Sequence, residues 1–77
     1  MSIGYGYHTT RDNLKADPQS LGVKLGRTCI RKDISASLVA QELGVSRQTI
    51  YNWFAGKYEP QKKIQERVQK YLTKIKG

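Results

Sequence analysis

Hydrogen-bonding side chains gather in the middle of the chain, between residues 47 and 52. They are Arg47, Gln48, Thr49, Tyr51 and Asn52. Arginine suits the major-groove edge of guanine and glutamine suits that of adenine, while hydroxyl, amide and guanidinium groups also bond to phosphate oxygens. If a single helix carries this set, its exposed face is equipped to bind nucleic acid.

The elements that would position this set are two short helices joined by a tight turn, over residues 36–54. Ala40 and Gly44 supply the small side chain and the corner glycine that two steeply crossing helices need at their closest approach. Ser46 follows the corner, where its hydroxyl can cap the second helix. The apolar residues whose spacing would close the two helices on each other are Val39, Ala40, Leu43, Val45, Ile50 and Trp53.

A helix is predicted before this pair. Asp17-Pro18 is a strong helix start, because aspartate caps and proline is tolerated in the first turn, and the helix would run to about Arg31. Its apolar stripe contains Leu21, Leu25 and Cys29, and Gly22 and Gly26 beside that stripe permit close helix contact. The link to the next helix would end at Ser35 as N-cap, with Ile34 as an apolar anchor, and Ser35 and Ser37 can also donate to a phosphate.

A further helix is predicted after the pair, from about Pro60 to Ile75. Gly56 suits a left-handed C-terminal cap and Pro60 a first helical turn. The inner face would contain Ile64, Val68, Tyr71, Leu72 and Ile75. The last three come late enough to leave an apolar strip uncovered, which favours a homodimer. The other faces carry cations that either attract DNA or merely keep the chain soluble: Lys62, Lys63, Arg67, Lys70, Lys74 and Lys76.

Residues 1–16 lack helical periodicity and are rich in Gly, Tyr and Thr, so we predict a flexible N-terminal arm followed by a domain over residues 17–77. The arm either adds a phosphate or minor-groove contact through Arg11 or Lys15, or is a loosely packed terminus. Tyr5 and Tyr7 alternate with glycines, a pattern that could instead form a short strand or contact a partner.

The central pattern resembles the Cro and lambda-repressor type of helix-turn-helix domain. The resemblance spans roughly Gln19 to Leu72 and rests on the following residues: Val39-Ala40, Leu43-Gly44-Val45-Ser46, Ile50, Trp53 and Gly56-Lys57. It implies an all-α fold, a compact bundle of four or five helices that binds operator DNA, commonly as a dimer.

The resemblance also implies roles for individual residues. Those that correspond to the family's base contacts are Arg47, Gln48, Tyr51 and Asn52, and those that correspond to its phosphate contacts are Ser46 and Thr49. In the family the following loop lies against the DNA backbone, so Lys57 and Tyr58 are expected on phosphates. This chain departs from the family at Ala36, where a phosphate-contacting glutamine is common. It also departs at Leu38 and Phe54, apolar residues that either pack against flanking segments or form a protein-binding surface.

Charge and composition agree with a polyanionic partner. The 77 residues make one small domain, with 14 basic and 6 acidic side chains and a net charge of +8. Cys29 has no partner for an internal disulfide and fits a buried thiol in a reducing compartment. His8 is far from Cys29, so no zinc-ligand spacing exists, and no cofactor or small-molecule effector is expected. We find no apolar run for a signal peptide or membrane span and expect the cytoplasm of a bacterium, or of a virus-infected cell.

The sequence therefore predicts a sequence-specific double-stranded-DNA-binding regulator of transcription, such as a small Cro-like repressor, and not an enzyme. Two alternatives share the same scaffold. One is a protein-interaction module, an inhibitor or antitoxin, favoured by Leu38, Phe54 and the tyrosines of the arm. The other is an accessory DNA-binding factor in recombination, which would make the same DNA contacts.

Overall fold

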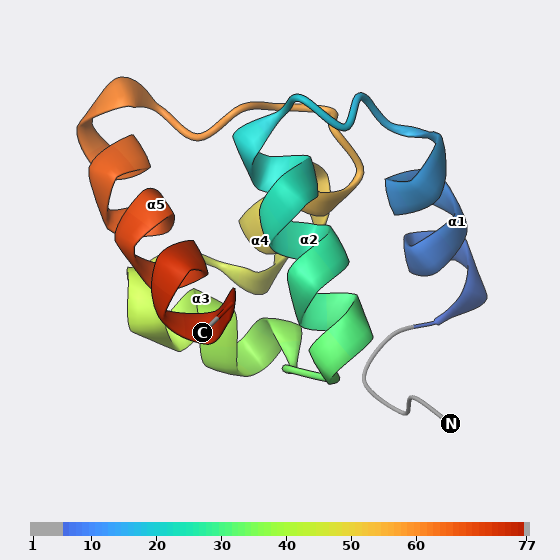
Figure 1. Ribbon diagram of the computed structural model, residues 1–77, viewed down its shortest axis with the longest axis horizontal. Helices are drawn as coiled ribbons and strands as arrows, with labels where there is room; N and C mark the ends of the chain where they lie inside the picture. Colours follow the sequence, from blue (N-terminus) through green and yellow to red (C-terminus); the bar gives the residue numbers. More distant parts are fainter. Residues whose placement is uncertain (1–5, 77) are drawn as a thin grey trace.

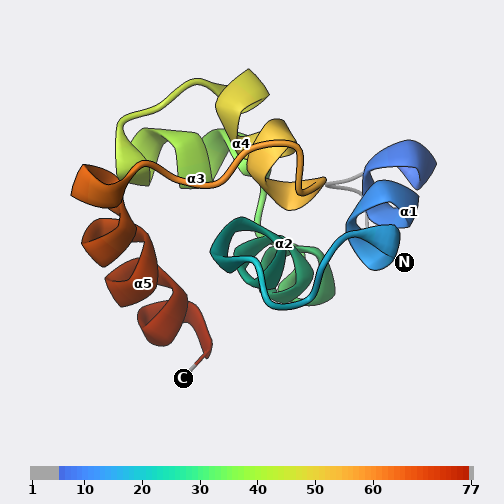
Figure 2. The same ribbon diagram turned by 90° about the horizontal axis from the view of Figure 1, so that it is seen from above.

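The computed structural model describes residues 6–76, and within that range the chain forms α-helices without strands. The helices are α1 (Tyr7–Lys15), α2 (Leu21–Lys32), α3 (Ala36–Leu43), α4 (Arg47–Phe54) and α5 (Lys62–Lys76). Helix α2 is central, with α1 and α5 on opposite sides of it (Figure 1). Seen from above, α3 and α4 lie together along one side of α2 (Figure 2). The predicted all-α bundle is confirmed.

The core lies where α2, α3, α4 and α5 meet. Helices α2 and α4 approach closely because α2 has glycines at the contact: a Cβ atom at Gly22 would lie 2.8 Å from the carbonyl oxygen of Trp53, and one at Gly26 would lie 2.8 Å from Cγ of Phe54. The predicted role of these glycines is confirmed. Side chains at most 1% exposed come from all four helices: Val23, Leu25, Cys29, Val39, Leu43, Ile50, Phe54 and Val68.

The start of α2 differs from the prediction at Asp17. Ser20 is the N-cap, since its hydroxyl oxygen accepts from the backbone N–H of Val23 at 3.4 Å, and the helix begins at Leu21. The Asp17 carboxylate instead accepts from the N–H of Gln19 at 2.9 Å. Aspartate readily forms such a local turn with the backbone two residues ahead, so Asp17-Pro18 shapes the turn before the helix.

The prediction that residues 1–16 lack a helix is wrong for Tyr7–Lys15, which form α1. Asn13 holds this helix against the bundle: its side chain is 1% exposed, and its Nδ2 donates to the carbonyl oxygens of Val23 at 3.2 Å and Phe54 at 2.7 Å. Arg27 adds a bond from α2 to the carbonyl of Leu14 at 3.3 Å. The tyrosine at position 5 lies outside the described residues.

The predicted apolar strip on the last helix is also wrong. Tyr71 is 9% exposed and Leu72 is 3% exposed, because α5 packs them against the core. Ile75 is half-buried, and the Lys32 ammonium donates to its carbonyl oxygen at 2.6 Å. The helix itself begins at Lys62, two residues after Pro60. The strip that favoured a dimer is therefore covered within one chain.

The burial of Phe54, Leu38 and Cys29 can be compared with the predictions from the sequence. Phe54 is fully buried, so it packs inside the bundle, whereas Leu38 remains 49% exposed. Phe54 thus gives no support to a protein-binding surface. Cys29 is buried as predicted, and burial raises the pKa of its thiol to about 12, so the thiol stays protonated and unreactive.

Candidate nucleic-acid interface

Helices α3 and α4 and the turn between them cover the predicted residues 36–54. Gly44 turns the chain with a φ of 71°, in the left-handed region that favours glycine, and the N–H of Val45 donates to the carbonyl of Ala40 at 3.0 Å. Ser46 then caps α4, its hydroxyl oxygen accepting from the N–H of Thr49 at 3.1 Å. The predicted corner and cap are both confirmed, so the start of α4 is fixed relative to α3.

Helix α4 presents the polar set found in the sequence. Arg47 and Gln48 are exposed in its first turn, and Tyr51 and Asn52 are half-buried one turn later. Nε2 of Gln48 donates to Oδ1 of Asn52 at 3.3 Å. This bond orients both amides and leaves Oε1 of Gln48, its second N–H and the Asn52 N–H groups for a ligand.

The hydroxyls of Ser46 and Thr49 lie 2.9 Å apart. Ser46 already accepts the backbone N–H of Thr49, so it completes its capacity best by donating to the Thr49 hydroxyl oxygen. The Thr49 O–H then remains available to an external acceptor. The Ser46 hydroxyl therefore mainly caps α4, whereas the Thr49 hydroxyl can donate to a ligand at the surface.

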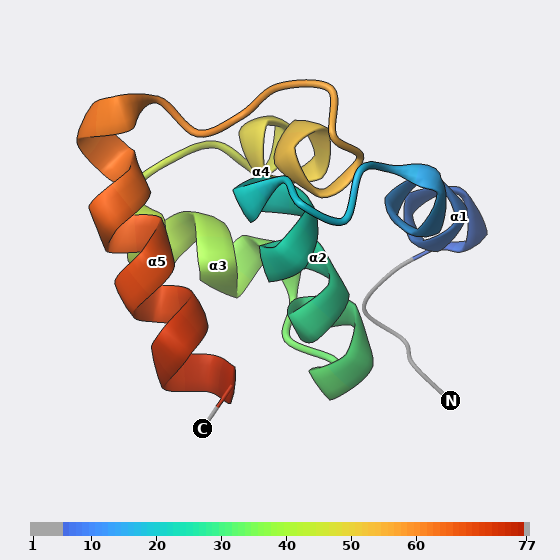
Figure 3. The ribbon, with the colours of Figure 1, turned by 45° about the horizontal axis from the view of Figure 1, so that its top comes forward.

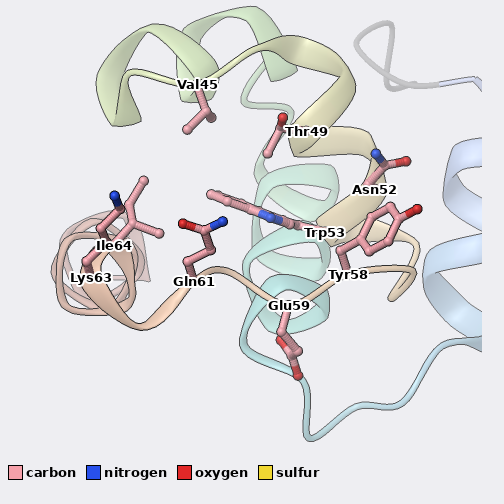
Figure 4. A pocket seen from close by; sticks show the side chains of 9 residues that line it. All are labelled: Val45, Thr49, Asn52, Trp53, Tyr58, Glu59, Gln61, Lys63 and Ile64. Atoms are coloured by element: carbon pink, nitrogen blue, oxygen red, sulfur yellow. The ribbon is translucent and has the colours of Figure 1, made fainter.

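A groove of about 510 Å³ runs beside α4, between that helix and residues 58–64 (Figure 4). The indole of Trp53 lies along its floor, with Val45 and Ile64 near it. Glu59 turns away from the groove in Figure 4 and accepts a hydrogen bond from the Ser20 hydroxyl at 2.9 Å. The polar lining is Thr49, Asn52, Tyr58, Glu59, Gln61 and Lys63, and the hydrogen bond from Ser20 holds the Glu59 carboxylate at the edge.

The groove brings together residues from both sides of a long loop. Thr49, Asn52 and Tyr58 were predicted from the sequence as contact residues, and they meet here. Sequence reasoning missed Gln61 entirely and counted Lys63 only among the cations of the last helix. The position of Lys63 in the sequence could have indicated this contact. Lys63 lies in the first turn of α5, and that end of the helix lies across the groove from α4.

The remaining predicted phosphate contacts lie elsewhere. Lys57 is exposed on the loop, where Gly56 has a φ of 76° and the Lys57 N–H donates to the carbonyl of Asn52 at 3.0 Å. This left-handed glycine after α4 confirms the predicted cap. Ser35 and Ser37 are exposed at the start of α3, and the Ser35 hydroxyl oxygen accepts from the N–H of Leu38 at 3.1 Å. Neither serine lines the groove.

Positive charge borders the turn from the α5 side. Nη1 of Arg67 donates to the carbonyl of Leu43 at 3.5 Å, which anchors the last turn of α3. Lys63 and Lys70 line a shallow recess with Arg67, and its single acid, Glu66, lies 3.4 Å from the Lys70 ammonium. The surface beside the α3–α4 turn is therefore cationic and suited to a polyanion.

Comparison with known proteins identifies the family to which the helix-turn-helix belongs. A helix-turn-helix family model matches residues 23–73, more than half of the chain, and the match leaves α1 outside. No curated protein and no solved structure gives a significant match. Among residues 6–76, no helix combines the length and the apolar content that crossing a membrane requires.

Proposed function

Because the chain belongs to the Cro and lambda-repressor type of helix-turn-helix family, whose domains bind DNA, we propose that it is a sequence-specific regulator of transcription that acts as a small repressor on double-stranded DNA. One observation carries the proposal: the exposed polar face of α4 directly follows a tight turn at Gly44 and a helix start that Ser46 caps. Such a face can enter the major groove as a unit.

In this proposal the first turns of α4 read bases. Arg47 donates two hydrogen bonds to guanine, and Gln48 pairs with adenine through its free Oε1 and second N–H. The Gln48–Asn52 bond at 3.3 Å supports this role, since it restricts the rotation of the Gln48 amide before DNA arrives. Tyr51 and Asn52 contact the neighbouring base pairs.

The phosphates on either side set the register. Thr49, Tyr58 and Lys63 line one groove and would follow one strand, with Lys57 beside them on the loop. Ser35 and Ser37 would contact the other strand from the start of α3. Ser46 would help by capping α4 and so holding that helix in place. Only Lys57 and Lys63 among these contacts are cations, so releasing counterions at two phosphates would lower the affinity about tenfold between about 50 and 200 mM salt.

Repression would follow from occupying DNA at a promoter, in the cytoplasm of a bacterium or of a virus-infected cell. We propose control through the concentration of the protein and through pairing of two copies on one site. Pairing of this kind predicts a palindromic binding sequence, because the symmetry of the DNA site mirrors that of the protein.

The test is selection of tight-binding duplexes from a random pool. Wild type is compared with the double variant Arg47→Ala plus Gln48→Ala, and with the matched control Gln69→Ala plus Lys74→Ala, which also removes one cation and one amide from exposed positions. One enriched motif, lost in the first variant and kept in the control, supports the proposal. No enrichment, or enrichment that survives the first variant, refutes it.

A further inference from the structure

Helix α1 exposes apolar residues to solvent and buries a polar residue against the bundle, the reverse of the usual arrangement. Tyr7 is 74% exposed and Leu14 is 65% exposed, whereas Asn13 is 1% exposed and faces the bundle. The helix lies outside the residues that match the family, so the helix-turn-helix function does not account for it. Its outer face has no partner among residues 6–76.

The outer face is one continuous stripe. Its residues follow the spacing of a single helical side and line a shallow recess of about 350 Å³: Tyr7, Thr10, Arg11, Leu14 and Lys15. A second recess of about 320 Å³ lies on the other side of Leu14, where α1 meets Arg27, Ile30 and Arg31 of α2. Leu14 therefore stands between two hollows, with Ile30 as a second apolar residue. We call this the α1–α2 surface.

The α1–α2 surface is cationic. Arg11, Lys15, Arg27 and Arg31 line its recesses, and no acidic residue does. The neighbouring Asp12 has Arg11 at 3.5 Å. The Nε atoms of Arg11 and Arg27 are buried and lack hydrogen-bond partners among residues 6–76. The surface thus offers positive charge around an apolar centre.

This surface lies apart from the proposed reading face. Its α2 residues belong to the second half of that helix, whereas α4 packs over Gly22 and Gly26 in the first half. Figure 3 shows α1 at the edge of the molecule opposite the α3–α4 turn. A ligand here would leave α4 open.

We propose that the α1–α2 surface binds an acidic amphipathic helix of another protein. Apolar residues of that helix would seat against Leu14 and Ile30, and its carboxylates would face the arginines. A second copy of this chain is a poor fit, because symmetric pairing would oppose like charges. The backbone of DNA is a poor fit as well, because its phosphates would pair with the arginines and leave Leu14 and Ile30 without an apolar partner.

The test uses a synthetic helical peptide with leucines spaced three and four residues apart and glutamates flanking them. A scrambled peptide of the same composition is the control. Binding to the full chain is measured by fluorescence anisotropy, with Leu14→Ser and the matched control Leu38→Ser, which alters an exposed leucine on α3. We expect binding at least tenfold weaker with Leu14→Ser or the scrambled peptide, and unchanged with Leu38→Ser. Circular dichroism checks that both variants fold.

Equal binding of the two peptides, equal effects of the two leucine variants, or no binding overturns the proposal. Peptide binding is also measured with Arg47→Ala plus Gln48→Ala. Retained binding there places the peptide away from α4, as proposed, and lost binding overturns that placement. DNA selection is scored separately, so either conclusion can fail without the other.

Discussion

Replacing Asn13 with alanine should destabilise the whole bundle, although the sequence predicts a flexible arm at this position. Its Nδ2 donates to the carbonyls of Val23 and Phe54, at 3.2 and 2.7 Å, from a side chain that is 1% exposed. Each such bond contributes about 0.5–1.5 kcal/mol, so losing both costs about 1–3 kcal/mol. The bond to Phe54 is the shorter of the two and joins α1 to the end of α4.

Urea unfolding measures this loss. Trp53 is the chain's only tryptophan and is 4% exposed, so its fluorescence reports the core, while circular dichroism reports helix content. Asn52→Ala is the matched control, an amide on the half-exposed side of α4, and should change the unfolding free energy by less than about 0.5 kcal/mol. If Asn13→Ala also changed the unfolding free energy by less than about 0.5 kcal/mol, the claim that α1 is part of the fold would be refuted.

Other substitutions test single contacts. Gly22→Ala should cost about 1–3 kcal/mol, since its Cβ would lie 2.8 Å from the Trp53 carbonyl oxygen, and an unchanged urea midpoint would contradict this packing. Gly44→Ala should cost about 1–2 kcal/mol because φ is 71°, again read from the urea midpoint. Burial raises the pKa of the Cys29 thiol from 9.0 to about 12, so only the unfolded chain ionises just above pH 9. The thiol's contribution to stability is therefore full below pH 9 and is lost between pH 9 and 12, by up to about 1.4 kcal/mol per pH unit. Cys29→Ala should show a shallower decline from pH 9 to 10, and an identical decline would argue against this linkage.

The helix-turn-helix was predictable because its signals are local. Ser35 and Ser46 each cap a helix that begins at the next residue, and Gly44 turns the chain directly after α3. Each of these contacts joins residues a few positions apart, so spacing alone identifies them. The predicted start of α2 at Asp17-Pro18 was wrong for the same reason, since Ser20 is an equally good cap three residues later and the helix uses it.

The groove beside α4 was not predictable in this way. Thr49 and Lys63 line it together, although a loop and the end of a helix separate them in sequence. Their proximity depends on how α5 packs against α2, which follows from burying Val68 and Leu72 and not from any local motif. Residue type located the polar face of α4, and tertiary packing decided which other side chains border it.

Helix α1 escaped prediction because its apolar residues point outward. A helix of nine residues is marginal by itself in water, so packing must hold it, and here Asn13 and Arg27 supply that packing through hydrogen bonds. Leu14, at 65% exposure, contributes little to the fold. Leu14→Ser should therefore shift the unfolding free energy by less than about 0.5 kcal/mol, where Asn13→Ala shifts it by about 1–3 kcal/mol. A large loss of stability in Leu14→Ser would mean that this leucine is needed for folding, and its exposure would then no longer argue for a partner.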